Sequence, residues 1–328
     1  MGILVTGSAG HLGEALVRTL RAQGRAVTGI DRVASPYTDH VGSIVDPAFV
    51  AAAMAGMRAV LHAATLHKPH VATHSRQAFV DTNVSGTLNL LEAAVANGVG
   101  AFVFTSTTSA YGDALVPADG APAAWIDEDV VPRAKNIYGA TKLAAEDLCR
   151  LFARNHALPC IVLRTARFFP EADDDESRRG AFQDANLKAN EYLYRRADVE
   201  DIVDAHLLAL EHAARIGFGR YVLSATTPFL AEDLAELRVD AAAVVRRRVP
   251  GWEDAYTRLG WRMHERIERV YVNARARADL AWRPRYDFAR VLAAVVAGED
   301  PRSPLARAIG SKGYHAGAYA DGLYPVVG

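Results

Sequence analysis

Short apolar runs alternate with longer amphipathic stretches through the first two-thirds of the chain, and this alternation restricts the possible folds more than any other feature. Apolar residues spaced three or four apart predict helices, and the short buried runs between them predict strands. The expected strands are residues 3–6, 26–30, 59–63, 101–105, 160–165 and 219–223. The expected helices are residues 11–23, 46–55, 79–96, 138–156 and 199–213. Because strands that alternate with helices are joined by right-handed crossovers, the pattern predicts an α/β protein with a doubly wound parallel sheet.

Two polar segments interrupt the alternation and are expected to leave the sheet. Residues 171–195 begin with the acidic run 171–176, and residues 230–249 are expected to be helical and to end in three arginines. Each charged run is expected to form a solvated face. Residues 1–170 and 196–229 are therefore expected to form the sheet domain, and residues 171–195 and 230–298 a small C-terminal lobe. The tail, residues 299–328, is rich in glycine, proline and tyrosine, and its role stays open.

Composition and charge exclude several classes of protein. The 328 residues are 50% hydrophobic and carry 37 Lys+Arg against 38 Asp+Glu, a formal net charge of −1. This balance is typical of a folded soluble protein and offers no basic face for a nucleic acid. No apolar run approaches the ~20 residues that span a bilayer, and the N-terminus lacks the layout of a signal peptide, so no membrane contact is expected. Cys149 and Cys160 cannot form a disulfide framework, which favours a cytoplasmic location.

Three glycines follow the first expected strand and open the first expected helix. In Thr-Gly-Ser-Ala-Gly-His-Leu-Gly, Gly7 permits a tight turn, Gly10 a close approach of the backbone to a pyrophosphate, and Gly13 close packing of helix on sheet. The free N–H groups of the helix N-terminus favour that pyrophosphate. Asp31, at the end of the second expected strand, can bind the adenosine ribose and repels a 2′-phosphate. The motif predicts a Rossmann-type domain that binds NAD, although Arg32 leaves NADP open.

Tyr138 and Lys142 lie one helical turn apart on one face of the expected helix 138–156. An ammonium near a phenol stabilises the phenolate, so Lys142 is expected to lower the pKa of Tyr138 from ~10, and an oxidised nicotinamide would add to this effect. A hydroxyl-rich segment, residues 104–112, lies at the end of the fourth expected strand. These residues predict that Tyr138 takes a hydroxyl proton while a hydride leaves the same carbon.

With these motifs the chain resembles the extended short-chain dehydrogenases/reductases, within them the NAD-dependent epimerase/dehydratase family, in a form like the UDP-glucose 4-epimerases. The resemblance covers about residues 1–290 and rests further on Leu-His-Ala-Ala at 61–64, Asn-Val-Ser-Gly-Thr at 83–87, Leu-Arg at 163–164, Asp-Val-Glu-Asp at 198–201 and Leu-Ala-Trp-Arg-Pro at 280–284. It implies a Rossmann-type fold with a small C-terminal substrate-binding lobe and NAD as cofactor. It also implies a homodimer formed through the helices expected at 79–96 and 138–156.

The resemblance implies a role for each matching residue. Tyr138 would be the general acid/base, Lys142 would bind the nicotinamide ribose, and Thr107 would hydrogen-bond the reacting oxygen. Ser43 replaces the Asp that the family usually has beside the adenine. The implied cofactor-binding residues are Gly7, Gly10, His11, Leu12, Gly13, Asp31, Arg32, Ser43, Ile44, Ala63, Ala64, Thr65, Asn83, Thr105, Tyr138 and Lys142.

The chain departs from the family's pattern near the substrate. Sugar-nucleotide 4,6-dehydratases carry an Asp-Glu pair directly after the catalytic threonine, where this chain has Thr108 and Ser109. Without these acids, elimination of water lacks a proton donor and acceptor, so dehydratase activity is not expected. Arg167 stands where nucleotide-sugar enzymes usually have Asn. It can clamp a phosphate or carboxylate, or it can pair with the acids at 173–175.

A histidine cluster follows the third expected strand. His67, His70 and His74 would lie on one face of a helix, and this leaves a zinc or iron site open, although no carboxylate or cysteine accompanies them and no metal is expected. With Lys68, the histidines could form a basic pocket for an anionic substrate. The residues expected to contact the substrate are His67, Lys68, His70, Thr108, Ser109 and Arg167.

Three functions follow from these residues. The leading one is an NAD-dependent epimerase of a sugar or sugar nucleotide, which works by transient hydride transfer with Tyr138 as acid/base. The alternative is an NAD-dependent dehydrogenase or reductase of a non-nucleotide alcohol or ketone. A regulator that senses the dinucleotide without chemistry is disfavoured, because such proteins typically lose the Tyr/Lys pair.

Overall fold

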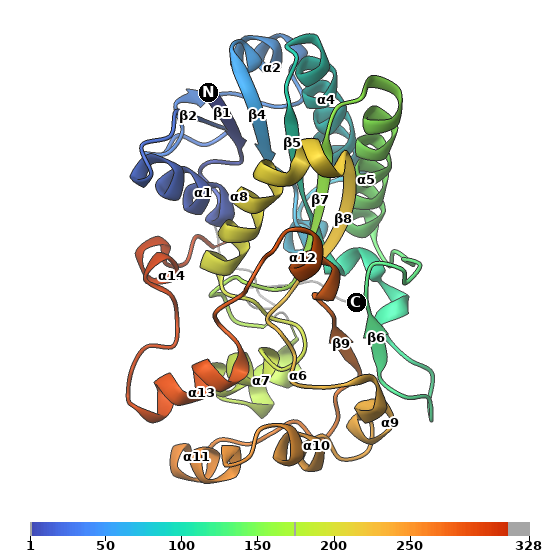
Figure 1. The fold of residues 1–328 in the computed structure, drawn as a ribbon, viewed down its shortest axis with the longest axis vertical. Coiled ribbons are helices and arrows are strands. Elements are labelled where there is room, and N and C mark those ends of the chain that lie inside the picture. The colour runs from blue at the N-terminus through green and yellow to red at the C-terminus, as the bar shows by residue number, and fades with distance from the viewer. Residues whose placement is uncertain (1, 174, 314–328) are drawn as a thin grey trace.

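A computed structural model describes residues 2–173 and 175–313, which form a sheet domain and a smaller lobe (Figure 1). The sheet has seven parallel strands in the order β3-β2-β1-β4-β5-β7-β8. They are β1 Gly2–Thr6, β2 Val27–Asp31, β3 His40–Val41, β4 Met57–His62, β5 Ala101–Thr107, β7 Cys160–Thr165 and β8 Phe218–Leu223. The doubly wound parallel sheet and its six expected strands are confirmed. The strand order reverses between β1 and β4, which places a crevice for a ligand at the carboxyl ends of these two strands.

Helices cover both faces of the sheet. Helices α1 (His11–Ala22) and α8 (Val199–Ile216) pack on one face, where their apolar residues share a buried cluster with β1, β5 and β7. Helices α2 (Pro47–Met54), α4 (Gly86–Ala96) and α5 (Ile137–His156) pack on the other face. The strands are therefore buried on both sides, which is why they appear in the sequence as continuous apolar runs.

The helix expected at 79–96 is not a single α-helix. A short helix, α3 (Arg76–Phe79), leads into a π-helical turn, Val80–Ser85, and only then does α4 begin. Single π turns within helices are frequent at functional sites because they redirect one side chain. This turn carries Asn83, which is 2% exposed.

The lobe lies beyond the carboxyl ends of the sheet strands (Figure 1). Its helices are α6 Glu176–Ala181, α7 Asp184–Glu191, α9 Leu234–Leu237, α10 Ala241–Arg248, α11 Trp252–Leu259 and α13 Phe288–Val296. The expected helix 230–249 is broken in two, because the Asp240 side chain accepts a hydrogen bond from Ala243 N and begins α10 anew. A separate apolar core, with Leu237, Val244 and Phe288 fully buried, holds these helices together.

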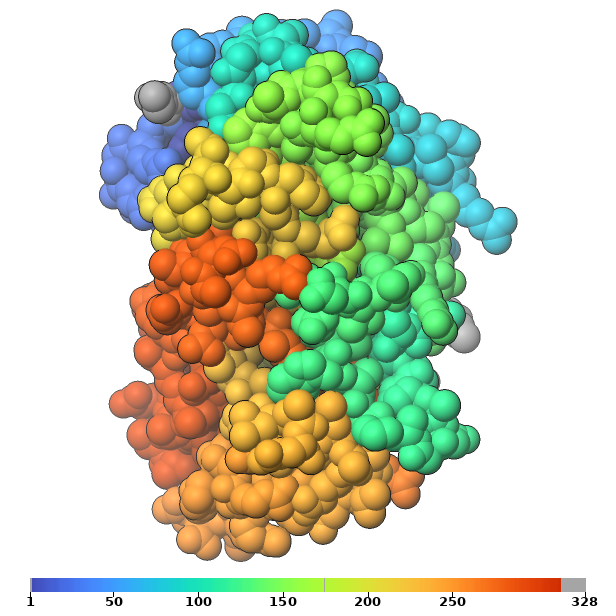
Figure 2. Space-filling view, turned by 45° about the vertical axis from the view of Figure 1, so that its right-hand side comes forward, coloured from blue at the N-terminus to red at the C-terminus, as the bar shows by residue number. Residues whose placement is uncertain are grey.

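A two-stranded parallel sheet, which the sequence pattern did not predict, joins the lobe to the chain before α5. Strand β6 (Ala124–Ile126) pairs with β9 (Arg269–Tyr271) across more than a hundred residues of sequence. In Figure 2 the green segment that precedes α5 accordingly lies against the orange lobe.

Two helices after β9, α12 and α14, return to the sheet domain, whereas α13 between them packs in the lobe. Helix α12 (Ala274–Asp279) packs on β8, and Trp282, fully buried, donates from Nε1 to the carbonyl oxygen of Asp201. Helix α14 (Pro304–Ile309) packs on α1 and α8. The tail expected at 299–328 is therefore structured as far as residue 313, and its remainder, residues 314–328, lies outside the described residues. No helix in the described ranges is long and apolar enough to cross a membrane.

Candidate active site

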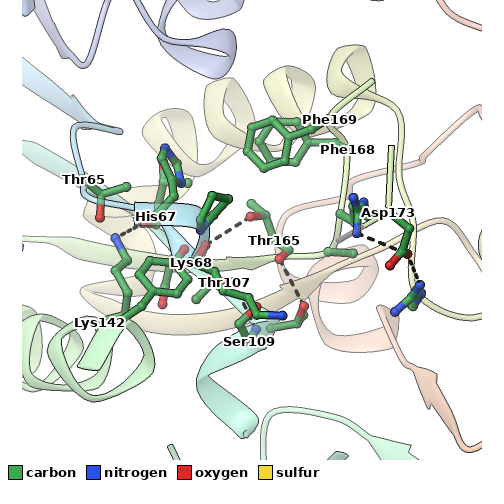
Figure 3. A pocket seen from close by; sticks show the side chains of 18 of the residues that line it. Thr65, His67, Lys68, Thr107, Ser109, Lys142, Thr165, Phe168, Phe169 and Asp173 are labelled. Atoms are coloured by element: carbon green, nitrogen blue, oxygen red, sulfur yellow. Dashed lines mark hydrogen bonds and ion pairs between the residues drawn. The ribbon is translucent and has the colours of Figure 1, made fainter. Parts of the chain in front are cut away.

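A cavity of about 800 Å³ opens between the carboxyl ends of the central strands and the lobe. Its walls come from the loop after β1, the ends of β4, β5 and β7, the start of α5, and the lobe elements α6 and β9. Figure 3 shows the side chains that line it, with Thr65 and Lys142 toward one end and Asp173 toward the other. The cavity thus occupies the crevice that the strand reversal predicts.

The glycine turn at one end fits the pyrophosphate of a dinucleotide. Gly7 has a φ of +74°, and a Cβ on Gly13 would lie 1.9 Å from the Gly7 carbonyl oxygen, so this turn requires glycine at both positions. Gly10 begins α1 without a side chain that caps the helix, which leaves N–H groups of its first turn for a ligand. Asp31 accepts hydrogen bonds from Ala9 N at 3.1 Å and Val33 N at 2.9 Å, which hold its carboxylate beside the turn.

Tyr138 and Lys142 enter the cavity from the first turns of α5. Asn136 begins this helix by accepting a hydrogen bond from Gly139 N, which orients the turn that carries Tyr138. Thr107, at the end of β5, lines the cavity together with Tyr138 and favours the ionised form of its hydroxyl. The expected group of three residues is therefore assembled around one end of β5.

The pKa shifts in this group differ from the sequence-based expectation. Burial raises the pKa of Tyr138 to about 12, and the hydrogen bond from Thr107 opposes this only in part. Burial lowers the pKa of Lys142 to about 7, although the nearby Glu146 carboxylate favours its charged form. The expected lowering of the Tyr138 pKa by Lys142 is thus wrong for the chain without a bound cofactor. Desolvation has the largest effect on this pKa, and the Lys142 ammonium donates its hydrogen bond to the Thr105 carbonyl oxygen.

Asn83 organises the backbone next to the cavity, as the resemblance implies. Its Oδ1 accepts hydrogen bonds from Thr65 Oγ1 at 2.9 Å and Leu66 N at 2.8 Å. Its Nδ2 donates to the Leu66 carbonyl oxygen and to Thr141 Oγ1, both at 3.1 Å. One buried amide therefore connects the loop after β4 to α5 in the turn between Tyr138 and Lys142.

Most of the expected site residues line the cavity. Those that do are Gly7, Gly10, His11, Leu12, Gly13, Ala63, Thr65, Thr105, Thr107, Tyr138, Lys142, His67, Lys68, Thr108, Ser109 and Arg167. Those that do not are Asp31, Arg32, Ser43, Ile44, Ala64, Asn83 and His70. Asp31 and Asn83 lie behind the lining and support it through the hydrogen bonds described above.

The histidine cluster is arranged differently from the expected helical face. The segment after His67 is a 3₁₀ helix, Lys68–Ala72, in which the Nδ1 atom of His70 accepts from His67 N instead of pointing into the cavity. The expected contact of His70 with substrate is therefore not supported, because its imidazole is used within the loop. Burial, then the neighbouring His70 and Lys142, lower the pKa of His67 to about 3, so His67 is neutral. Within the described residues, no group of three or more His, Cys, Asp or Glu could hold a metal.

Aromatic rings form one wall of the cavity. Phe169 lies edge-on to both His11, with ring centroids 5.6 Å apart, and His67, with centroids 5.8 Å apart. His67 in turn lies 6.4 Å from the Tyr138 ring, and Figure 3 shows Phe168 and Phe169 side by side at this wall. His11 is the first residue of α1, directly after Gly10 of the glycine turn. Both of its ring nitrogens are buried without a hydrogen-bond partner among the described residues.

The acidic run 171–176 is a solvated face only in part, because Asp175 and Glu176 are exposed whereas Glu171 and Asp173 are buried. Asp173, 5% exposed, lies 3.3 Å from Arg167 and 2.7 Å from Arg195. Glu171 accepts hydrogen bonds from the backbone of Lys312 and Gly313. Of the two alternatives for Arg167, pairing with the neighbouring acids is present in the structure.

Several lining residues were not found from the sequence. They are the cations Lys135, Arg178, Arg179, Arg195 and Arg269, the acids Asp173, Asp175 and Glu176, and Phe168, Phe169 and Tyr271. No spacing in the sequence marks them, because they come from the lobe and from loops that only the folded chain brings to the sheet. The polar run 171–195 is the one signal that could have pointed to the group around Asp173.

A parallel sheet with a glycine turn at its switch point, followed by a tyrosine and a lysine on one helix, defines a short-chain dehydrogenase/reductase. The NAD dependent epimerase/dehydratase family matches residues 3–223, and the chain belongs to this family. NAD as the cofactor, expected from the glycine motif and Asp31, agrees with the family.

Known relatives differ in what they do. The chain is 29% identical to a UDP-glucose 4-epimerase of Rhizobium meliloti (strain 1021), over 88% of this chain and 94% of that protein. It is 32% identical to a 2-alkyl-3-oxoalkanoate reductase of Stenotrophomonas maltophilia (strain K279a), over 65% of this chain and 66% of that protein. A crystal structure of a short-chain dehydrogenase/reductase superfamily protein from Agrobacterium tumefaciens with bound NAD has a TM-score of 0.66, is 26% identical, and shares 90% of this chain and 96% of that one. An NAD-dependent activity of the epimerase/dehydratase family is supported, and its substrate is a separate question.

Proposed function

We propose that the protein is an NAD-dependent epimerase of a sugar or sugar nucleotide, with Tyr138 as its acid/base. The observation that carries this proposal is that Tyr138 and Lys142, both on α5, line one cavity together with Thr107. The absence of an acid pair at positions 108 and 109 argues against a dehydratase.

Each residue of this group has a distinct task in the proposed reaction. Tyr138 takes the proton of a substrate hydroxyl and later returns it, and Thr107 orients the reacting oxygen. Lys142 binds the nicotinamide ribose and adds positive charge. NAD, when bound, supplies the hydride acceptor and a positive ring charge that lowers the raised pKa of the phenol. The keto intermediate must rotate in the site, so that the hydride returns to the opposite face of its carbonyl carbon.

The remaining expected residues would hold the cofactor. The glycine turn and the first N–H groups of α1 would bind the pyrophosphate, and Asp31 the adenosine ribose. Ser43 and Ile44 would border the adenine, and Ala63, Ala64 and Thr65 the nicotinamide half. Phe169 and His67 narrow the cavity near Tyr138, which would help to exclude water from the reacting carbon.

The alternative is a net dehydrogenase or reductase of a non-nucleotide alcohol or ketone. The pairing of Arg167 with Asp173 favours it, because an arginine already neutralised is less available to a diphosphate. The similarity to a 2-alkyl-3-oxoalkanoate reductase also supports it.

One experiment separates the two functions. Mass spectrometry of small molecules released from the denatured protein identifies the bound dinucleotide, and turnover is then followed at 340 nm with candidate sugars and alcohols. An epimerase keeps its NAD and converts substrate without net reduction. Steady accumulation of free NADH would exclude the epimerase and support the dehydrogenase.

We also propose a cytoplasmic homodimer formed through α4 and α5, as in relatives of the family. The buried free thiols of Cys149 and Cys160 suit a reducing compartment, and Leu151 on α5 is 43% exposed in the single chain. Light scattering should give twice the chain's mass, and Leu151→Glu should give a monomer. A wild-type monomer at micromolar concentration would contradict this proposal.

A further inference from the structure

Arg269 enters the cavity from the lobe, and the part of the chain that the structure describes gives its side chain no ion pair. Along β9, Val270 is fully buried in the lobe core, whereas its neighbours Arg269 and Tyr271 both line the cavity, as the alternation of a strand requires. The Arg269 Nε atom is buried and has no hydrogen-bond partner among the described residues. Within the same residues, no carboxylate lies within ion-pair distance of its guanidinium. A buried guanidinium donor without an acceptor is costly, so this position calls for an acceptor from outside the chain.

The other arginines of the cavity are already engaged. Arg167 and Arg195 share the Asp173 carboxylate, at 3.3 and 2.7 Å. Arg179 donates from Nη1 to the carbonyl oxygen of Asp173 at 2.6 Å. Arg178 lies 3.3 Å from Asp175. Arg179 is thus held by a neutral carbonyl group, so Arg179 and Arg269 both lack an anionic partner in the described part of the chain. Of these two, Arg269 is the one whose buried Nε atom also lacks a hydrogen-bond acceptor there.

We propose that Arg269 binds one carboxylate of the substrate, which is therefore a sugar acid or a related polyhydroxy acid. This inference rests on the proposed function only in placing the reacting carbinol at Tyr138. A planar guanidinium pairs with a carboxylate through two parallel hydrogen bonds, and one such pair balances one charge. The strongly cationic lining, with eight lysines and arginines against three acids, attracts such an anion to the cavity.

Equilibrium binding to the NAD-loaded protein tests this subsite without requiring turnover. The ligands are glucuronate and galacturonate, with glucose, glucose 1-phosphate and UDP-glucose as comparisons, measured by titration calorimetry. We expect a uronate to bind at least about tenfold more tightly than glucose. Arg269→Met should weaken uronate binding about 10- to 100-fold and leave glucose binding unchanged, since only the charged pair is lost.

Two further variants identify the cause of any loss. Arg269→Lys keeps the positive charge but loses the planar guanidinium with its two parallel N–H donors. We expect its affinity for a uronate to lie between those of the wild type and Arg269→Met. Arg266→Met removes an exposed arginine three residues away that lines a different groove of the lobe, and it should bind uronate like the wild type. Thermal unfolding of each variant verifies that the lobe is folded.

Several results would overturn the proposal. Unchanged uronate affinity in Arg269→Met would do so, as would equal losses in Arg269→Met and Arg266→Met. Tighter binding of glucose 1-phosphate or UDP-glucose than of either uronate would assign the subsite to phosphate. The proposed function fails separately, because full turnover by Tyr138→Phe would refute the acid/base role while leaving the uronate affinities as they are.

Discussion

The Lys142 ammonium donates a hydrogen bond to the Thr105 carbonyl oxygen at 2.7 Å and lies 4.0 Å from the centroid of the Phe104 ring. The contact fastens α5 to the end of β5, where Thr107 meets Tyr138. It also keeps a charged group in a site from which water is largely excluded, since Lys142 is 2% exposed. The carbonyl, the aromatic face and the nearby Glu146 carboxylate compensate this charge in part.

The first prediction concerns stability as a function of pH. Burial lowers the pKa of folded Lys142 to about 7, while an unfolded lysine stays protonated up to about 10.5. Between these values the unfolded chain binds more protons, so the stability that Lys142 contributes should rise with pH, and below about 7 it should be constant. Relative to Lys142→Met, the wild type should gain at most about 1.4 kcal/mol per pH unit from pH 7 to 10. Urea unfolding at each pH measures this, and parallel curves for the two proteins would contradict it.

The second prediction concerns Tyr138. Tyr138→Phe removes the hydroxyl proposed as acid/base and should lower kcat by about two to four orders of magnitude with little change in cofactor affinity. Tyr37→Phe is the control, because this ring packs beneath the Arg18 guanidinium outside the cavity and should leave kcat unchanged. Equal activity of Tyr138→Phe and wild type would remove Tyr138 from the mechanism.

The third prediction concerns the choice between NAD and NADP. The Asp31 carboxylate, held by Ala9 N and Val33 N, should repel a 2′-phosphate. Asp31→Asn should therefore reduce the preference for NAD over NADP by about tenfold or more, chiefly by improving NADP binding. Asp39→Asn, which alters an acid paired with Arg21 at the surface, should leave the ratio of dissociation constants unchanged. An unaltered ratio in Asp31→Asn would show that another residue discriminates between the cofactors.

The fourth prediction concerns Asn83. Asn83→Ala removes four hydrogen bonds and leaves buried partners on the loop after β4 unsatisfied, so the free energy of unfolding should fall by about 2–4 kcal/mol. Asn97→Ala removes a single bond to the Ala93 carbonyl at the end of α4, and the loss should stay below about 1 kcal/mol. Denaturant unfolding measures both variants, and equal losses would mean that Asn83 does not organise the site.

The elements that could be predicted are those with a local cause. The sheet strands appear as apolar runs because both faces are covered, and the glycine turn follows from the strain that any Cβ at position 13 would create. Strand β5 extends two residues beyond its predicted end, to Thr107, because its pairing with β7 continues to Thr165. The π turn at Val80–Ser85 and the pair of β6 with β9 were missed, since both depend on partners distant in sequence.

The sequence by itself determined the sheet, the dinucleotide turn and the Tyr–Lys helix, because periodicity, glycine sterics and helical spacing act over a few residues. The tertiary structure decided the charges of the cavity. Asp173 pairs with both Arg167 and Arg195, while Arg269, about a hundred residues later in the chain, enters the cavity without an ion pair among the described residues. Coulomb interactions depend on distances in the folded chain and on burial. Burial raises the pKa of Tyr138 although a lysine follows it on the same helix face.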